Sequence, residues 1–311
     1  MNAIKRKLPR AFLKRNELVK MTVRERIVNI VAFALFAIYA FLFLYLIFYL
    51  VFNSLFLNAY WYGVMIDDPG AHVEFNFTLT NYINSLGVSV LNSEGIDIYL
   101  TEMFFNSLWF CLISVIGTVM MSTFTGYVVA KYEFKGRNFI YSVAIFCMTI
   151  PIIGTTSALL KLVNSDILPI YNTPFYVIFT SLGGFGFNFM VMHAFFKNVS
   201  WNYVEAVLID GGGHFTAFFK VILPQASASI ITLIIVSLIG SWNDYATPMM
   251  FLPDYPTVAS GIYQITSSNM RDADMPKLFA GLVLSFLPAL ILFAIFSDRI
   301  MKNFSIGGLK G

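Results

Sequence analysis

One stretch of this sequence sets the organisation of the rest. Residues 197–223 read KNVSWNYVEAVLIDGGGHFTAFFKVIL, and Pro224 follows them. The pattern predicts two short helices joined by a turn of three glycines, residues 211–213, because glycine adopts a positive φ without steric cost. Apolar residues recur at helical spacing on one face of each helix, namely Trp201, Val204, Val207 and Leu208, then Phe215, Phe218, Phe219 and Ile222.

We expect the second apolar face, Phe215 to Ile222, to pack on the ends of membrane helices of the same chain. The first face would meet either those ends or a partner protein. A connecting segment that forms its own helices at a membrane surface is more typical of a docking surface than of a simple link. The sequence therefore predicts a docking segment at 197–223.

Composition indicates a polytopic membrane protein. The chain has 311 residues, of which 58% are hydrophobic and 12% are charged, whereas soluble domains carry about 25% charged residues. About 20 apolar residues cross a bilayer as a helix. Six runs of at least that length contain no Asp, Glu, Lys or Arg, and they are residues 27–66, 103–130, 138–160, 167–196, 221–243 and 278–297. The fold is therefore predicted to be all-α, with six transmembrane helices.

The runs divide the chain into regions: a basic N-terminal tail at 1–26, a first transmembrane helix at 27–52, an extracytoplasmic segment at 53–102, a five-helix core at 103–298 containing the segment 197–223, and a C-terminal tail at 299–311. With both termini in the cytoplasm, the inner segments hold 17 of the 20 Lys and Arg residues, as the positive-inside rule requires. The outer segments hold ten of the 17 acidic residues. This topology places the docking segment in the cytoplasm.

Local signals refine the regions. Pro151 is expected to kink the third span, at about 138–161. Glycines 183, 184 and 186 favour a close helix approach or a break in the fourth span, at about 174–196. Alternating apolar residues at 73–79 predict a strand in the outer segment.

Several chemistries are not indicated. Cys111 and Cys147 lie in separate apolar runs, and the three histidines, at 72, 193 and 214, are scattered, so no metal site is predicted. The chain contains no G-x-x-x-x-G-K-[ST] phosphate-binding loop, and we expect it to bind no ATP and no other cofactor itself. We expect contact with membrane lipid and none with nucleic acid, and we do not expect an enzyme.

The docking segment also resembles a known signature. Glu205-Ala206, Asp210-Gly211 and Leu223-Pro224 are similar to the "EAA" motif of permease subunits in binding-protein-dependent ABC importers. The sequence departs from the motif at Val207, where a second alanine is usual, at Gly212, where alanine is common, and at Ser200, where proline often stands. The resemblance implies coupling helices that sit in a cleft of a separate ATPase subunit.

On this resemblance, the ATPase-coupling residues would be Glu205, Ala206, Leu208, Asp210, Gly211, Gly212 and Phe218. The Glu205 and Asp210 carboxylates would either make charged contacts to the ATPase or only cap and solvate the turn. The family fold is that of type I (MetI-like) importer permeases.

Four further stretches resemble the six-span permease subunits of maltose-type carbohydrate importers. They are Phe105-Asn-Ser-Leu-Trp109, residues 132–137 (YEFKGR), Gly240-Ser-Trp-Asn-Asp244 and the glycine-containing C-terminus at 304–311. The resemblance implies import of a carbohydrate, most directly an oligosaccharide. It also implies a second permease subunit, an ATPase dimer that binds the ATP and Mg²⁺, and an extracytoplasmic solute-binding protein. In that family the C-terminal tail reaches the ATPases, through residues that would here be Gly307, Gly308 and Lys310.

Three polar residues are candidates for the translocation path: Asn188, Asn243 and Asp244. An intramembrane carboxylate marks a pathway by default, although Asp244 would equally suit a helix end, bound to backbone amides. Other readings also stay open, including a polyol or glycerol phosphate as the solute and a self-contained secondary transporter. The latter usually needs mid-membrane acids and repeated halves, and the sequence shows no clear case of either. A membrane anchor or receptor with this fold is a third reading.

Overall fold

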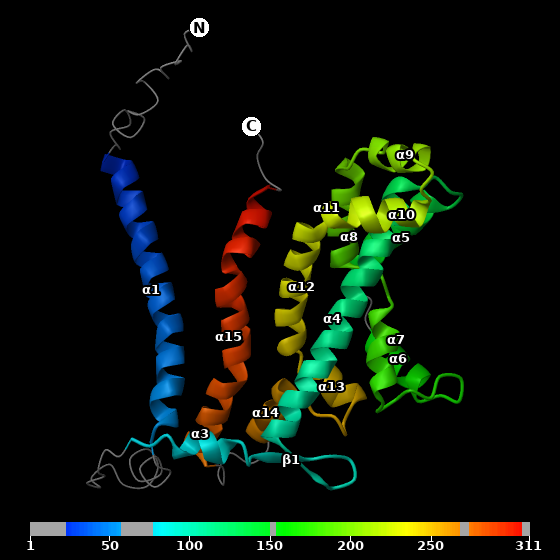
Figure 1. Cartoon of the computed structure of the whole chain (residues 1–311). Helices are drawn as coiled ribbons and strands as arrows, with labels where there is room; N and C mark the ends of the chain where they lie inside the picture. Colours follow the sequence, from blue (N-terminus) through cyan, green and yellow to red (C-terminus); the bar gives the residue numbers. More distant parts are fainter. Residues whose placement is uncertain (1–22, 57–76, 150–153, 268–273, 307–311) are drawn as a thin grey trace, which may run out of the picture. The chain divides into compact units, whose positions relative to one another are not determined.

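A computed structural model (Figure 1) describes residues 23–56, 77–149, 154–267 and 274–306, the last nine of these without their side chains. The chain divides into two compact units, residues 1–53 and 54–311. The first unit is essentially one helix, α1 (Val23–Ser54), which covers the expected first span. Its aromatic rings pair at i, i+4 spacing, as in Tyr39 with Phe43 and Phe48 with Phe52. The predicted basic tail lies mostly outside the described residues.

The second unit is a bundle built around α4 (Leu100–Lys131), which corresponds to the second expected span. Helix α4 packs along α8 (Phe187–Asn198), α7 (Pro174–Ser181) and α12 (Ser227–Trp242). The last helix, α15 (Met275–Ile306), packs on α12. The Trp242 indole N–H donates to the Ser285 carbonyl oxygen at 2.9 Å, which joins the last residue of α12 to α15.

Three helices in the described part of the chain, α1, α4 and α15, are individually long and apolar enough to cross a membrane. The other expected spans are shorter or divided. The third consists of α5 (Arg137–Thr149) and α6 (Thr155–Val163), and Pro151 lies between them, outside the described residues. The fourth is broken between α7 and α8. The apolar runs of about 20 residues therefore coincide with helices, but the helices within a run need not be continuous.

The break in the fourth span occurs where the glycines predicted it. Gly184 and Gly186 have φ values of 62° and 141°, which only glycine adopts readily. The break frees backbone groups from the helical ladder, and the Thr125 hydroxyl donates to the Gly184 carbonyl oxygen at 2.7 Å. Irregular backbone at membrane depth is tolerated when neighbouring helices supply such partners.

Close packing of α4 on the fourth span depends on Gly117. A Cβ atom at this position would lie 2.6 Å from the Ser181 Cβ atom, which is far too close. We expect Gly117→Val to lower stability by about 1–3 kcal/mol through overpacking, seen as a lower melting temperature. Gly240→Val is the matched control, because a Cβ atom there meets nothing within 4 Å. Equal melting temperatures of the two variants would contradict this packing.

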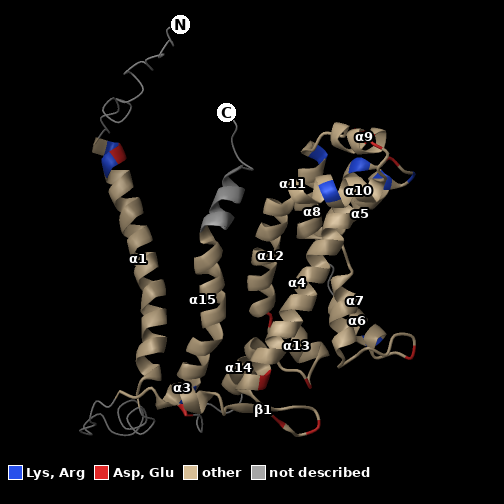
Figure 2. Ribbon diagram, viewed as in Figure 1, with Lys and Arg blue, Asp and Glu red and all other residues tan. Residues whose placement is uncertain are grey.

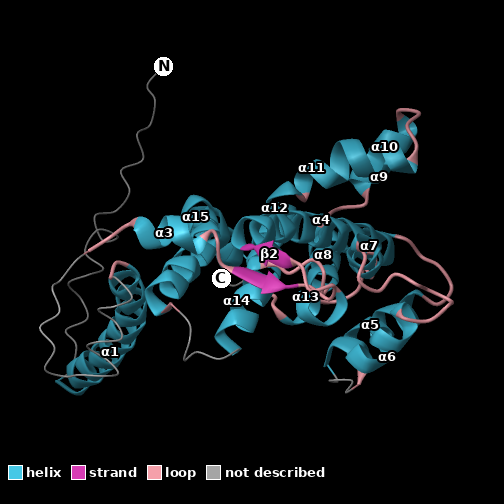
Figure 3. Cartoon of the chain, turned by 90° about the horizontal axis from the view of Figure 1, so that it is seen from below, coloured by secondary structure: helices cyan, strands magenta, loops and turns pink. Residues whose placement is uncertain are grey.

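The two ends of the bundle differ in structure and charge. One end carries the short helices α9 (Asn202–Ile209), α10 (His214–Ala217) and α11 (Leu223–Gln225), and we call it the helix-pair end. The other carries a hairpin of strands β1 (Ser89–Leu91) and β2 (Asp97–Tyr99), which pair antiparallel (Figure 3), and we call it the hairpin end. Figure 2 shows most Lys and Arg residues gathered at the helix-pair end and several acidic residues on the loops of the hairpin end.

The hairpin was not the strand that the sequence predicted. Residues 73–76 of the predicted strand lie outside the described residues, and Phe77 forms only an isolated bridge with Phe56. Helix α3 (Thr80–Ser85) follows, and then the hairpin. Its turn is closed by the Asn92 side chain, which accepts hydrogen bonds from the N–H groups of Glu94 and Ile96. The hydrogen bonds of the Asn92 side chain fix the position of the hairpin, and alternation of apolar residues does not.

Two further helices belong to the hairpin end. Helix α13 (Ala246–Phe251) follows α12 directly, and α14 (Val258–Ser267) packs on α4. At this end a buried cluster includes Phe110, Tyr176 and Phe251, with the Tyr176 and Phe251 rings stacked at a centroid distance of 4.5 Å. A second cluster at the helix-pair end joins α4, α8 and the predicted docking segment.

Candidate coupling site

The first predicted docking helix is α9 (Asn202–Ile209), and its C-terminus forms a complete glycine cap. Gly211 has φ +81°. The Gly212 N–H donates to the Val207 carbonyl oxygen at 2.8 Å, and the Gly211 N–H donates to the Leu208 carbonyl oxygen at 3.1 Å. This pair of bonds is the Schellman motif, which requires a left-handed residue at the position of Gly211. The glycine turn was therefore predicted correctly.

Gly212 is also held tightly. A Cβ atom there would lie 2.6 Å from Val207 Cγ1 and 3.0 Å from the Val207 carbonyl oxygen. Val207 and Gly212 are two of the positions at which the sequence departs from the EAA motif. The structure shows why they depart together: the larger side chain at 207 fills the space that an alanine methyl group at 212 would need.

The second half of the segment is not one regular helix. It consists of α10 (His214–Ala217), a π-helical turn at Phe218–Ile222 and α11 (Leu223–Gln225). This run is bent by 70° relative to α12. Pro224 lies in α11, which continues directly from the π turn.

The π turn corrects the predicted apolar stripe. Phe218 is 3% exposed and Ile222 is fully buried, but Phe215 is 80% exposed and Phe219 is 46% exposed. An i→i+5 turn changes the rotation per residue, so side chains at i, i+3 and i+4 no longer share one face. The prediction was right for Phe218 and Ile222 and wrong for Phe215. It was right in part for Phe219, whose ring packs edge-on against Phe124 of α4 at a centroid distance of 5.9 Å.

The first helix needs a smaller correction. Val204 is fully buried, and Trp201 and Val207 pack against the same cluster, as predicted. Leu208 is instead exposed, beside Ile209, which is 85% exposed. The buried face of α9 is one turn long and narrower than the sequence pattern, because only its side toward α4 and α8 has neighbours.

Tyr132, just after α4, joins both halves of the segment. Its hydroxyl lies 3.0 Å from His214 Nδ1, at the start of α10, and its ring packs edge-on against Trp201, at the start of α9. The Lys131 ammonium group donates to the Val199 carbonyl oxygen. Sequence reasoning missed both residues as organisers of the site. In the sequence, only their position pointed to them: Lys131 and Tyr132 stand at the end of a predicted span, at the start of the family-like stretch 132–137.

The exposed surface of the segment combines apolar and acidic groups. We define the docking surface as Tyr203, Glu205, Ala206, Leu208, Ile209, Asp210 and Phe215, all of which are exposed. Within the described residues, the Glu205 and Asp210 carboxylates have no hydrogen-bond or ion-pair partner, so neither caps the turn. An apolar surface of this kind on a rigid element is typical of a protein interface.

A cavity of about 340 Å³ adjoins the docking surface. It lies between the last turns of α4 and α10, and its lining includes Phe124, Val128 and Phe215. The buried Tyr127 hydroxyl, also at this cavity, has no hydrogen-bond partner in the part of the chain that is described. The exposed Phe215 ring therefore borders a hollow and is not packed into a neighbouring helix.

The three predicted path residues are each engaged differently. The Asn188 amide donates to the Ser237 hydroxyl at 3.1 Å, a bond that joins α8 to α12. The Asn243 amide donates to the Ile239 carbonyl oxygen of its own helix at 2.8 Å. Asp244 accepts a hydrogen bond from the Thr247 N–H at 3.0 Å, at the start of α13. For Asp244 this geometry matches the helix-end alternative.

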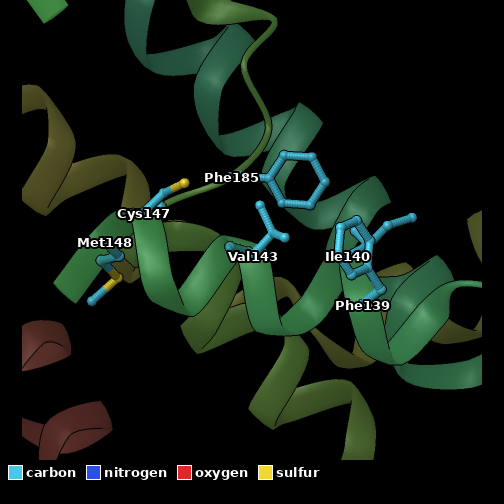
Figure 4. A pocket seen from close by; sticks show the side chains of 8 residues that line it. Phe139, Ile140, Val143, Cys147, Met148 and Phe185 are labelled. Carbon is cyan, nitrogen blue, oxygen red and sulfur yellow. The ribbon is translucent and has the colours of Figure 1, made fainter. Parts of the chain in front are cut away.

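An apolar hollow beside the broken fourth span is not suited to a sugar. This cavity of about 430 Å³ lies between α5 and the Phe185–Gly186 break, and Figure 4 shows Val143, Cys147 and Phe185 around it. Its other lining side chains are also apolar. A hydroxyl-rich solute would lose its hydrogen bonds to water there without replacement. None of the three path residues lines it.

Two other groups of predictions, on the C-terminal contacts and on metal binding, stay predictions. Gly307, Gly308 and Lys310, the predicted C-terminal contacts, lie outside the described residues. Over the ranges that are described, no cluster of three or more His, Cys, Asp or Glu residues could hold a metal ion.

Comparison with known proteins identifies the class. The sequence model of the family described as "binding-protein-dependent transport system inner membrane component" matches residues 119–305. The match covers more than half of the chain, and the chain therefore belongs to this family of ABC importer permeases.

Relatives include the diacetylchitobiose uptake system permease protein NgcG of Streptomyces coelicolor, 29% identical over 69% of this chain and 71% of that protein. The arabinooligosaccharides transport system permease protein AraQ of Bacillus subtilis is 28% identical over 70% of this chain and 76% of its own length. A crystal structure of a bacterial ABC transporter that imports the acidic polysaccharide alginate includes a chain with the same fold, with a TM-score of 0.72 at 18% identity, covering 90% of this chain and 99% of that one.

Proposed function

We propose that the chain is one of two permease subunits of an ATP-driven importer of carbohydrate, most directly of an oligosaccharide. An ATPase dimer would bind ATP and Mg²⁺, and an extracytoplasmic binding protein would deliver the solute. The named relatives support the substrate class, since their names specify diacetylchitobiose and arabinooligosaccharides. The helix-pair end would face the cytoplasm, together with both termini.

The observation that carries the proposal is the docking surface. It presents exposed apolar side chains and two unpaired carboxylates on a short helix whose opposite face is buried. Tyr132 and the buried Val204 and Phe218 fix this helix to α4 and α8. A rigid anchored element can transmit a displacement from a partner, whereas a flexible loop would absorb it. Closure of the ATPase dimer would thus move the membrane helices.

A different solute is the second candidate. Another relative, 26% identical, is the sulfoquinovosyl glycerol transport system permease protein SmoH of Agrobacterium fabrum. The name of this relative supports glycerol-containing or polyol solutes as the alternative for this chain. Identifying the ligand of the cognate binding protein separates the two candidates directly.

The coupling role is tested by Gly211→Val in the assembled importer. Because Gly211 has φ +81°, a β-branched residue there would cost about 1–2 kcal/mol and distort the turn. We expect the ATPase to hydrolyse ATP still, while solute uptake per ATP falls about tenfold. Gly154→Val is the control, since Gly154 also has a positive φ, of 91°, and open space around it.

The proposal fails if Gly211→Val and Gly154→Val give the same uptake per ATP. It also fails if the purified chain alone moves solute in proteoliposomes without nucleotide, which would favour a self-contained transporter. Retention of a stoichiometric ATPase during purification is the expected companion result.

A further inference from the structure

Two exposed tyrosine rings lie against each other at the hairpin end. Tyr245 stands directly before α13 and Tyr263 lies in α14, two helices that are neighbours in Figures 1 and 3. The rings stack at a centroid distance of 4.4 Å with an interplanar angle of 19°, and each residue is 42% exposed. We call Tyr245 and Tyr263 the tyrosine pair. The docking surface does not explain it, because that surface belongs to the other end of the bundle.

Polar atoms without partners accompany the tyrosine pair. Neither of its hydroxyl groups has a hydrogen-bond partner among the residues that the structure describes. The two preceding residues each use only part of their side chain: Asn243 donates its amide to the Ile239 carbonyl oxygen, and Asp244 Oδ1 accepts from the Thr247 N–H. Within the described ranges, Asn243 Oδ1 and Asp244 Oδ2 therefore stay available as acceptors, next to Tyr245 in the chain.

Helix α14 is fixed against α4, with Tyr263 on its other side. A Cβ atom at Gly261 would lie 2.3 Å from Met103 Sδ, so the two helices touch there with no space between them. Ile262 is buried in the same cluster as Met103. Tyr263 follows Gly261 by two residues, which is a rotation of about 200° around a helix. Its ring therefore faces away from α4, and close packing of the helix holds it in that direction.

The loop between α13 and α14 is fastened to α4 as well. The Asn106 amide donates to the Pro256 carbonyl oxygen at 3.1 Å. The Ser107 hydroxyl accepts from the Val258 N–H, the first residue of α14, at 2.8 Å. Asn106 and Ser107 belong to the first turns of α4. The start of α14 is therefore tied to a long helix by two side-chain bonds, in addition to the apolar packing.

Hydrogen bonds also hold the chain on both sides of α13. Before it, the Trp242 indole bond to α15 fixes the end of α12, from which Tyr245 follows. After it, the Asp254 carboxylate accepts from the Ser93 N–H of the hairpin turn at 2.9 Å, and the Asp254 N–H donates to Asn172 Oδ1 at 3.0 Å. Both rings of the tyrosine pair thus stand on anchored elements. A preorganised pair loses little conformational freedom when a ligand binds.

The chemistry of the tyrosine pair suits a sugar ring. A sugar ring has apolar C–H faces and a rim of hydroxyl groups. Tyrosine supplies the matching combination of an apolar ring and a polar tip, and small-molecule sites typically combine aromatic side chains with a few placed polar groups. The free acceptors of Asn243 and Asp244 can take hydrogen bonds from sugar hydroxyls. Tyrosines that only face lipid would make no use of these acceptors.

We propose that the tyrosine pair is a stacking site for one ring of a neutral oligosaccharide, with Asn243 and Asp244 accepting hydrogen bonds from its hydroxyl groups. The Asp244 carboxylate disfavours an anionic sugar at this position. That this sugar is the imported solute rests on the proposed function, whereas the stacking site itself rests on the geometry of the two rings.

The test is saturation-transfer NMR on the assembled importer in nanodiscs, without binding protein or nucleotide, with diacetylchitobiose and arabinotriose as probes. We expect saturation of the C–H protons of the sugar rings. Tyr245→Ala and Tyr263→Ala should each weaken sugar binding about three- to tenfold, whereas Tyr263→Phe, which keeps the ring, should lose less. Tyr99→Ala is the matched control, because Tyr99 is 44% exposed at the end of β2 and has no ring partner in the described part of the chain.

The melting temperatures of all these variants should equal that of the wild type, since the replaced rings are exposed. Equal sugar affinity of Tyr245→Ala, Tyr263→Ala and Tyr99→Ala would overturn the stacking site. So would glycerol, which has hydroxyl groups but no ring, if it bound as strongly as the sugars and with the same dependence on the two rings. Loss of the second permease subunit from the alanine variants, with sugar affinity unchanged, would show a subunit contact instead. If no ATPase assembles with the chain, the proposed function fails, but the sugar affinities of the chain alone in nanodiscs still decide the stacking site.

Discussion

Replacing Ile209 with aspartate is expected to abolish retention of the ATPase subunit while the permease stays folded. Ile209 is 85% exposed at the last turn of α9, so its replacement removes no buried contact within the chain. In a partner's cleft the same side chain would be a central apolar anchor, and such anchors contribute about 2–4 kcal/mol. The affinity should therefore fall about 30-fold to 1,000-fold. A new carboxylate would also sit beside Glu205 and Asp210, which adds repulsion at an acidic contact surface.

The measurement is the amount of ATPase that co-elutes with the permease, together with the dissociation constant in detergent. Ile167→Asp is the matched control, since Ile167 is 86% exposed but lies on the α6–α7 turn at the hairpin end. Melting temperatures of both variants should equal that of the wild type. Equal ATPase retention by the two variants would show that α9 is not the contact.

Gly212→Ala is expected to destabilise the coupling turn, and Val207→Ala is expected to restore it. The added methyl group would lie 2.6 Å from Val207 Cγ1, and overpacking of this kind costs about 1–3 kcal/mol. Removing the Val207 methyl groups opens that space, although the Val207 carbonyl oxygen stays 3.0 Å from the new atom. We expect the two substitutions to be coupled by about 0.5–3 kcal/mol.

The test is a double-mutant cycle on melting temperature, with uptake per ATP measured for the same four proteins. Gly213→Ala serves as the neighbouring control, because a Cβ atom at Gly213 meets nothing within 4 Å. If the melting temperature lost by the double variant equals the sum of the losses of the two single variants, positions 207 and 212 are not coupled. The steric explanation of their departure from the EAA motif would then be wrong.

Composition and periodicity were enough to predict the helical fold and the glycine turn. These features depend on residues close together in sequence, such as the apolar run of α1 and the positive φ of Gly211. The breaks were only partly predictable. Glycine and proline marked where the third and fourth spans divide, but the partner that makes a break acceptable, such as Thr125 for Gly184, lies 59 positions away.

The site shows the same limit. The sequence predicted a docking segment with Glu205 and Asp210 at its surface, and both are exposed. It did not predict which apolar residues would be buried, because the π turn at Phe218–Ile222 changes the facing of every later side chain. Tyr132 was missed because its contact with His214 joins positions 82 residues apart. The Asp254 contact with Ser93 spans 161 positions, and no local pattern reports such a meeting.

Helix α4 makes the two ends of the molecule mechanically dependent on each other. It is one unbroken helix of 32 residues, about 48 Å long. Its C-terminus leads into Tyr132, against the docking segment, and its first turns hold the loop of Asp254 through Asn106 and Ser107. An unbroken helix behaves as a stiff rod, so a tilt imposed by ATPase closure would reach the opposite side of the bilayer without any intermediate joint. Release of the binding protein would then follow from the movement of this rod.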